Sequence, residues 1–142
     1  MLCARKGKFG LNMQVMSNCC GQTLDLSINY GGASADCIMF EASDLFGDLE
    51  NGLLHPSLSL YGDNAYLNKS YMETLFPNVS GGGEDVYNFY HSQLQIRIEC
   101  CFVQLVHCWG ILRTALPTKM QIVHVICLVN CLAHLHNFVL MR

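Results

Sequence analysis

The chain has few charged residues. Of its 142 residues, eight are Lys or Arg and eleven are Asp or Glu, and the net charge is −3. A protein that holds DNA through many phosphates normally presents a basic face, because Lys and Arg make those contacts. The composition therefore argues against a self-sufficient DNA-binding module, and recognition of a DNA target would fall to another domain or to a partner protein.

The start of the chain lacks the features of a secretory signal. Arg5, Lys6 and Lys8 are not followed by the apolar stretch that a signal peptide needs. The nine cysteines are an odd number and include the adjacent pairs Cys19-Cys20 and Cys100-Cys101. Without secretion, this cysteine usage favours a reducing compartment.

A long stretch just before the last residue of the chain lacks charged side chains. No Lys, Arg, Asp or Glu occurs from Met120 to Met141, so its length would permit a membrane span. Polar residues interrupt it throughout: Gln121, His124, Asn130, His134, His136 and Asn137. A span with so many polar groups would need interior partners. We predict a largely buried core helix that follows Pro117 and is capped by Thr118, with a membrane anchor as the alternative.

This helix also carries His124, Cys127, Cys131 and His134 on one face, which suggests a zinc site. The geometry argues against it. At about 1.5 Å of rise per residue the outer two lie about 15 Å apart, whereas zinc ligands lie about 2.0 to 2.3 Å from the metal. One straight helix therefore cannot supply all four ligands.

Two strands are predicted near the start, over Leu11 to Ser17 and Thr23 to Tyr30, joined into a hairpin by a turn at Asn18 to Gly21. In the second strand, alternation points Asp25 outward, so we discount it as a catalytic acid. The same alternation points three apolar residues inward: Leu24, Leu26 and Ile28.

Two helices are predicted in the middle of the chain. The first runs from Asp36 through Asn51, with Ser34 or Asp36 as its cap and Gly52 beyond its end. After a polar linker from Leu67 to Glu84, the helical pattern resumes from Asp85 to Arg113. The second helix carries residues that fit a base-stacking or phosphate-binding surface, although such residues are more often core: Tyr87, Tyr90, His91, His107 and Trp109.

Between these helices, the stretch from Leu58 to Leu67 is typical of a short strand that ends at Gly62 and delivers Asp63 to its carboxyl end. Open sheets bind ligands outside the carboxyl ends of their strands, so Asp63 suits a metal or phosphate site. An acid followed by Asn after a glycine is also ordinary turn chemistry, and both interpretations stay open.

A second carboxylate, Glu99, falls within the second predicted helix. Helical spacing places it on one stripe with Ile96, Val103 and Val106. A carboxylate among apolar side chains needs a cation, a proton or a donor, and Arg97 points elsewhere. A divalent metal would satisfy Glu99, and Asp63 could share it.

Several motifs, in a specific order, carry a family resemblance. They are Gly62-Asp63-Asn64-Ala65-Tyr66, Pro77-Asn78, Tyr87-Asn88-Phe89-Tyr90-His91-Ser92, Arg97-Ile98-Glu99-Cys100-Cys101-Phe102, Trp109-Gly110-Ile111-Leu112-Arg113 and Leu132-Ala133-His134-Leu135-His136-Asn137-Phe138. From about Lys6 to about Phe138 the sequence resembles the C-terminal part of Harbinger-type DDE transposases and their domesticated nuclease relatives. Asp36 matches a turn aspartate of that family outside the catalytic triad.

The resemblance implies an α/β, ribonuclease-H-like fold: a mixed sheet flanked by helices, with residues 1–142 as one partial domain. Asp63 and Glu99 would be the second and third acids of the catalytic triad. Three such acids hold two divalent ions, Mg²⁺ or Mn²⁺, about 3.5 to 4 Å apart for phosphodiester cleavage. DNA is then the substrate, a separate DNA-binding protein is an expected partner, and the nucleus is the expected location, with the cytoplasm as the alternative.

In the family, the first acid lies on a strand that would precede Lys6 to Gln14 in the sequence. In the folded sheet that strand would be central, with Leu11 to Ser17 on one side of it and Leu58 to Tyr61 on the other. Without that strand, unpaired backbone groups cost about 1 to 3 kcal/mol each, so we expect poor folding, pairing with a second copy, or an incomplete gene model. Four residues depart from the family pattern. Gln95 and Cys108 stand where the family usually has Arg, Val103 stands where it usually has Gly, and Leu75 stands where it usually has Pro. The expectation is therefore an endonuclease crippled by loss of its first Asp, with a non-catalytic remnant or domesticated interaction protein as the alternative, and no membrane association.

Overall fold

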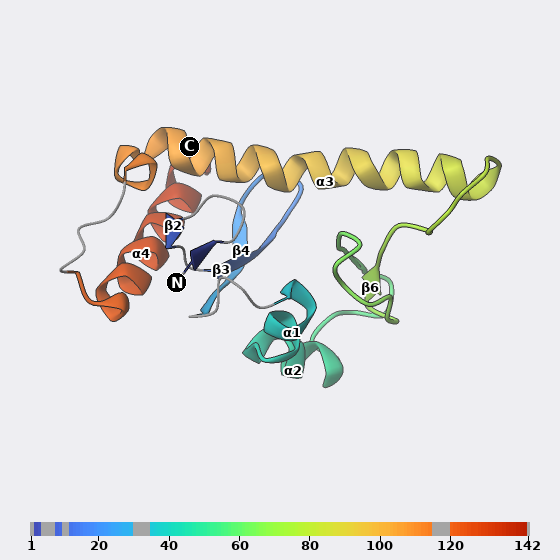
Figure 1. The fold of residues 1–142 in the computed structure, drawn as a ribbon, viewed down its shortest axis with the longest axis horizontal. Coiled ribbons are helices and arrows are strands. Elements are labelled where there is room, and N and C mark those ends of the chain that lie inside the picture. Colours follow the sequence, from blue (N-terminus) through green and yellow to red (C-terminus); the bar gives the residue numbers. More distant parts are fainter. Residues whose placement is uncertain (1, 4–7, 10–11, 30–34, 115–119, 142) are drawn as a thin grey trace. The chain divides into compact units, whose positions relative to one another are not determined.

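The computed structural model describes residues 2–3, 8–9, 12–29, 35–114 and 120–141, and within them the chain is a mixed α/β protein. In chain order the elements are β1 (Leu2–Cys3), β2 (Lys8–Phe9), β3 (Asn12–Ser17), β4 (Thr23–Asn29), α1 (Asp36–Glu41), α2 (Asp44–Glu50), β5 (Leu60–Tyr61), β6 (Met72–Glu73), α3 (Gly83–Cys108), the 3₁₀ helix η1 (Gly110–Arg113) and α4 (Ile122–Leu140) (Figure 1). The described strands pair as β1-β2, β3-β4 and β5-β6.

The chain forms two compact units. The first contains Met1–Gln14 and Asn29–Ile96, and the second contains Val15–Ile28 and Arg97–Arg142. The elements β3 and α3 each contribute one part to each unit.

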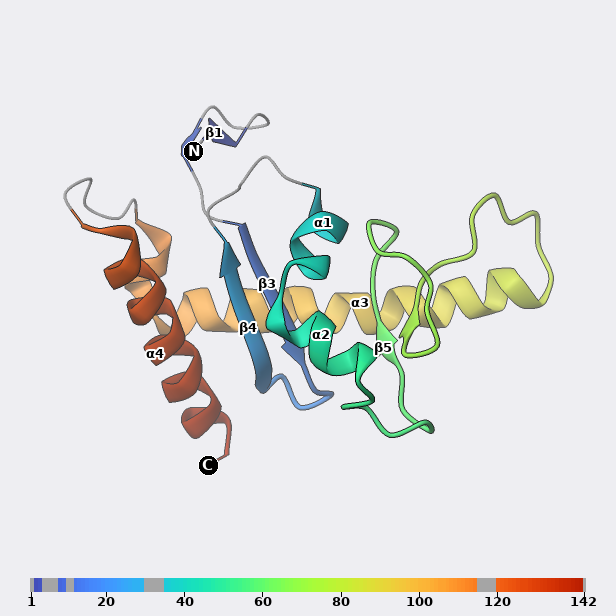
Figure 2. The same cartoon turned by 90° about the horizontal axis from the view of Figure 1, so that it is seen from below.

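The β3-β4 hairpin confirms the predicted pair of strands, and Figures 1 and 2 show the two strands side by side. Its turn is built by Asn18, whose side-chain oxygen accepts hydrogen bonds from the backbone N–H groups of Cys20 and Gln22, both at 3.0 Å. Gly21 completes the turn at φ +83°, a conformation that glycine adopts without a steric penalty. The predicted end residues Leu11 and Tyr30 lie outside the described part of the chain.

Within the second unit, α4 is fastened to the hairpin by Asn137. Its side-chain oxygen accepts from the Thr23 N–H at 2.8 Å, and its side-chain nitrogen donates to the Thr23 carbonyl at 2.7 Å. The predicted inward orientation of Leu24 is wrong, since this side chain is 59% exposed. Alternation places Leu24 and Leu26 on one face, but only part of that face is covered. Leu26 is half-buried beside a small pocket that Cys101 and His136 also line.

The helix predicted from Asp36 to Asn51 is two helices, α1 and α2, separated by Ala42 and Ser43. Ser43 causes the break: its hydroxyl donates to the Phe40 carbonyl at 2.6 Å and accepts from the Phe46 N–H at 3.2 Å, which starts the second helix. The predicted Asp36 cap is also wrong, because the N-cap of α1 is Ala35. Ser34 lies outside the described residues, and Gly52 follows α2 at φ +84°, as predicted.

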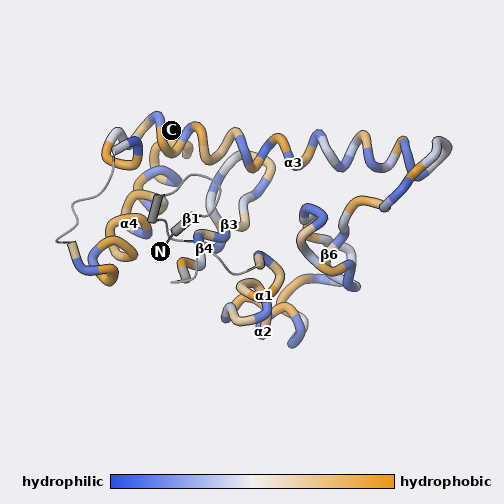
Figure 3. Tube along the Cα trace, viewed as in Figure 1, coloured by the Kyte–Doolittle hydropathy of each residue, from blue (hydrophilic) through white to orange (hydrophobic). Residues whose placement is uncertain are grey.

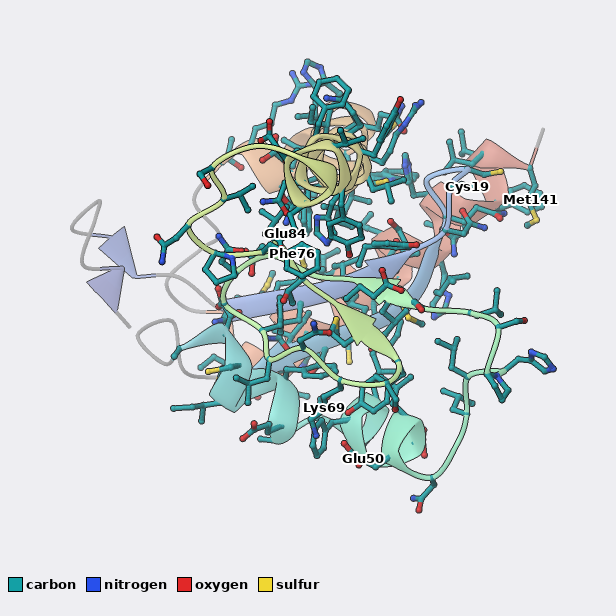
Figure 4. All side chains as sticks on the ribbon, turned by 90° about the vertical axis from the view of Figure 1, so that its right-hand side faces the viewer. Cys19, Glu50, Lys69, Phe76, Glu84 and Met141 are labelled. Atoms are coloured by element: carbon teal, nitrogen blue, oxygen red, sulfur yellow. The ribbon has the colours of Figure 1, made fainter. Side chains whose placement is uncertain are left out.

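The segment predicted as a polar linker contains a buried strand, β6, that pairs in parallel with β5. Leu49, Tyr71 and Met72 form the core of the first unit, with Phe40, Leu45, Leu54, Leu60 and Tyr66 packed against it. At its edge the Lys69 ammonium and the Tyr71 hydroxyl both bind Glu50, and Figure 4 shows Lys69 and Glu50 beside each other. The hydrogen bond from Lys69 lowers the pKa of Glu50.

The long helix α3 begins at Gly83 and ends at Cys108, so the predicted run to Arg113 is interrupted at Trp109. Arg113 turns back over the helix end, where its guanidinium donates to the carbonyls of Val106 at 3.1 Å and His107 at 3.0 Å. These carbonyls have no partner within the helix, so Arg113 completes the hydrogen bonding of the final turn.

The last helix, α4, runs from Ile122 to Leu140 with Gln121 as its N-cap, whereas the predicted cap Thr118 lies outside the described residues. Its buried residues share one face: Val125, Val129, Leu132, Ala133 and His136. Outside this face, α4 mixes polar residues with exposed apolar ones, so the predicted burial holds for one face only (Figure 3). The exposed large apolar side chains are Ile122, Val123, Leu135, Phe138 and Val139. By length and composition α4 is also the one described helix that could cross a membrane, a test that core helices pass as well.

Candidate active site

Asp63 lies two residues beyond the end of β5, as the sequence predicts. Its carboxylate accepts a hydrogen bond from the Ala65 N–H at 2.8 Å, and its carbonyl accepts from the Tyr66 N–H at 3.2 Å. This is the Asx-turn geometry that the alternative interpretation predicts. The side chain is exposed, so a carboxylate oxygen remains accessible to a ligand from solvent.

Gly62 allows Asp63 to lie this close to the core. The backbone at Gly62 is buried, and a Cβ atom there would lie 2.9 Å from the Met72 Sδ and 3.0 Å from the Tyr66 Cδ2. Both distances are shorter than a normal van der Waals contact. A side chain at this position would push the turn that carries Asp63 away from β6.

The first unit also gathers Asp36 near the same turn. Asn12 donates to the Asp36 carboxylate at 3.1 Å, and Gln14 donates to the Asp36 carbonyl at 2.7 Å. Burial first, and then the negative charges of Asp36 and Asp63, raise the pKa of Tyr66 to about 12. Tyr66 therefore stays protonated at neutral pH, in the field of both carboxylates.

The helix α3 holds the backbone before Asp63 through two side chains. The Gln95 side-chain nitrogen donates to the Gly62 carbonyl at 3.3 Å. The His91 Nε2 lies 3.2 Å from the Glu73 carbonyl, which also accepts from the Gly62 N–H at 2.9 Å. In the sequence, Gln95 stands out only as a departure from a family Arg. Its contact with Gly62 depends on the pairing of β5 with β6, which the sequence does not reveal.

Glu99 lies on α3, in the second unit, and its environment differs from the prediction. The glutamate is exposed, and its stripe neighbours Ile96 and Val103 are 47% and 56% exposed. Periodicity correctly identifies residues that share a face, but the buried face of α3 carries His91, Cys101 and Leu105 instead. Burial among apolar side chains is therefore no reason for Glu99 to need a cation.

The other candidate residues have structural contacts. His91 is 2% exposed and His107 is hydrogen-bonded to Arg113 at 3.0 Å. Of the proposed stacking residues, Tyr90 is exposed, while the Tyr87 hydroxyl donates to Glu73 at 2.9 Å and its pKa is raised to about 12, first by burial. Across the described ranges no group of three or more His, Cys, Asp or Glu could hold a metal ion.

Residues 1–137 match the family model described as DDE superfamily endonuclease. The chain belongs to the DDE superfamily endonucleases. It is 29% identical over 103 aligned positions to the Mus musculus protein named "Putative nuclease HARBI1", covering 68% of this chain and 29% of that protein. The chain thus spans less than a third of the length of this relative. No solved structure matches the chain.

The family membership confirms the resemblance drawn from the ordered motifs. Because Asp63 belongs to the first unit and Glu99 to the second, their meeting at one metal site stays a prediction. The assignment of residues 1–142 to one partial domain also stays a prediction.

Proposed function

We propose that this DDE superfamily endonuclease chain is part of a ribonuclease-H-like nuclease in which Asp63 and Glu99 bind divalent metal ions for cleavage of DNA. Both side chains are exposed carboxylates, and carboxylate oxygen is the ligand that Mg²⁺ and Mn²⁺ prefer. When bound, such ions would activate the attacking water or 3′-hydroxyl and stabilise the leaving oxygen.

One observation carries the proposal. Asp63 follows the end of β5 in an exposed turn, where its carboxylate accepts a hydrogen bond from the Ala65 N–H at 2.8 Å and keeps an oxygen open to solvent. Open sheets bind ligands outside the carboxyl ends of their strands. This supports Asp63 as a metal ligand, and the family membership supports Glu99 as the acid that shares the metal with it.

The protein's own residues have defined roles in this proposal. The Asp63 carboxylate is oriented by the Ala65 N–H and keeps its free oxygen for a metal. Glu99 supplies a second carboxylate from a rigid helix.

The wider setting is also proposed. A net charge of −3 supports a separate DNA-binding protein or domain that delivers the substrate, because the chain itself offers few phosphate contacts. A nuclease acting on chromosomal DNA would work in the nucleus. Homo-oligomerisation is a further expectation, because strands in this fold need neighbours.

Incubation of the purified chain with supercoiled plasmid in Mg²⁺ or Mn²⁺ tests the proposal. We expect metal-dependent nicking that is abolished by Asp63→Asn or Glu99→Gln. Asp48→Asn, which changes an exposed acid on α2, is the matched control and should retain activity. Cleavage that survives both Asp63→Asn and Glu99→Gln contradicts the assignment.

A second candidate function is a non-catalytic remnant or a domesticated interaction protein that retains the fold. The exposure of Glu99 favours it, because an exposed carboxylate has no need of a cation to offset burial. Under this alternative, the folded chain does not nick DNA at any metal concentration.

A further inference from the structure

The peptide groups on both sides of Gly62 are fixed by hydrogen bonds. On one side the Gly62 N–H donates to the Glu73 carbonyl of β6 at 2.9 Å. On the other side the Gly62 carbonyl, which belongs to the same peptide group as the Asp63 N–H, accepts from Gln95 at 3.3 Å. The backbone that delivers Asp63 is therefore held by one strand and one helix.

His91 reinforces this attachment one helical turn before Gln95. It is 2% exposed, its Nε2 lies 3.2 Å from the Glu73 carbonyl, and its ring packs against those of Tyr61 and Tyr87 at 5.6 and 5.7 Å. Because residues four apart share a helix face, His91 can bind the Glu73 carbonyl of β6 while Gln95 binds the Gly62 carbonyl just after β5. The two side chains thus attach this part of α3 to the β5-β6 pair that precedes and supports the Asp63 turn.

We infer that Gln95 is a positioning residue for Asp63. The Asp63 side chain is exposed, and its hydrogen bond to the Ala65 N–H keeps it within its own turn, so the turn itself must be located by its neighbours. Of the hydrogen bonds described above, the one from Gln95 reaches the peptide group next to Asp63. This inference rests on the proposed role of Asp63 as a metal ligand.

The test compares Gln95→Met, which keeps the length of the side chain and removes its donor, with Gln93→Met, the same change at an exposed position of α3. Backbone NMR of the full chain measures the Asp63 amide shift and the hydrogen exchange of Gly62 and Ala65. Titration with Mn²⁺ measures the concentration that half-broadens the amides of the Asp63 turn. Gln95→Arg, which retains a donor, serves as the rescue variant.

In Gln95→Met we expect faster hydrogen exchange at Gly62 and Ala65. The Mn²⁺ concentration that half-broadens the amides of the Asp63 turn should rise about two- to tenfold, because one hydrogen bond is lost. Gln93→Met should match the wild type, and Gln95→Arg should recover most of the effect. If the wild-type turn shows no Mn²⁺ broadening, the metal role of Asp63 fails, and the exchange rates still decide the positioning role. If the Asp63 amide shift and the exchange rates of Gly62 and Ala65 in Gln95→Met equal those of the wild type, the inference is overturned.

Discussion

Gly62→Ala is the substitution whose effect follows most directly from the structure. The new Cβ would lie 2.9 Å from the Met72 Sδ and 3.0 Å from the Tyr66 Cδ2, closer than such atoms normally approach. Met72 is 5% exposed and packs in the core with Leu49 and Tyr71, so it has little room to move. Overpacking of this kind costs about 1 to 3 kcal/mol, and we expect that loss in the free energy of unfolding.

Gly47→Ala provides a matched control in the same unit. Gly47 lies inside α2, and a Cβ there would have no heavy atom within 4 Å. Because Ala is favoured over Gly in a helix interior, this substitution should stabilise the protein by about 0.5 to 1 kcal/mol. The same Gly→Ala change is therefore expected to lower the free energy of unfolding at position 62 and to raise it at position 47.

Urea unfolding followed by far-ultraviolet circular dichroism measures both effects, with equal slopes required for the comparison. A second variant, Gly62→Ala with Met72→Ala, removes the closest contact and should show a smaller effect of the Gly62 change than the single variant does. Wild-type or greater stability of Gly62→Ala would refute the packing described around Asp63.

Three further predictions concern stability. Asn137→Leu should lower the free energy of unfolding by about 2 to 3 kcal/mol in urea denaturation, because both hydrogen bonds to Thr23 are lost; an effect below the error of the fit would contradict this. Ser43→Ala should cost about 1 kcal/mol in the same measurement, since the Phe46 N–H loses its cap; a gain in stability would argue against the capping role. Burial lowers the pKa of His136 below its usual 6.5. The contribution of the neutral imidazole to the free energy of unfolding is therefore fully present above about pH 6.5, and it is lost as the pH falls through that value toward the pKa of the folded state. The urea midpoint should therefore fall between about pH 7.5 and about pH 5 by less in His136→Leu than in the wild type, and equal falls would exclude His136 as the cause.

The hairpin was predictable because its signals are local. Asn18 and Gly21 are turn residues with a direct conformational reason, and apolar strands flank them. The position of Asp63 after a strand was predictable for the same reason, since Gly62 interrupts the apolar run.

Other features depend on contacts that are distant in sequence. The strand β6 has two residues, too few for alternation to be visible, and it is defined by pairing with β5. The burial of α3 is another case, because periodicity shows that Ile96, Glu99 and Val103 share a face but not which face the core covers. The break at Ser43 had a visible signal, a good N-cap residue followed by Asp44, that competed with a continuous helical pattern.

The amide of Asn137 has a consequence for association between molecules. It binds the N–H and the carbonyl of Thr23 as a residue of a neighbouring antiparallel strand would, so it occupies the first ladder position on the outer edge of β4. An exposed edge is a template on which strands of other chains add and fibrils grow. A helix side chain that mimics a peptide group thus protects this edge, and an incoming strand must first displace it.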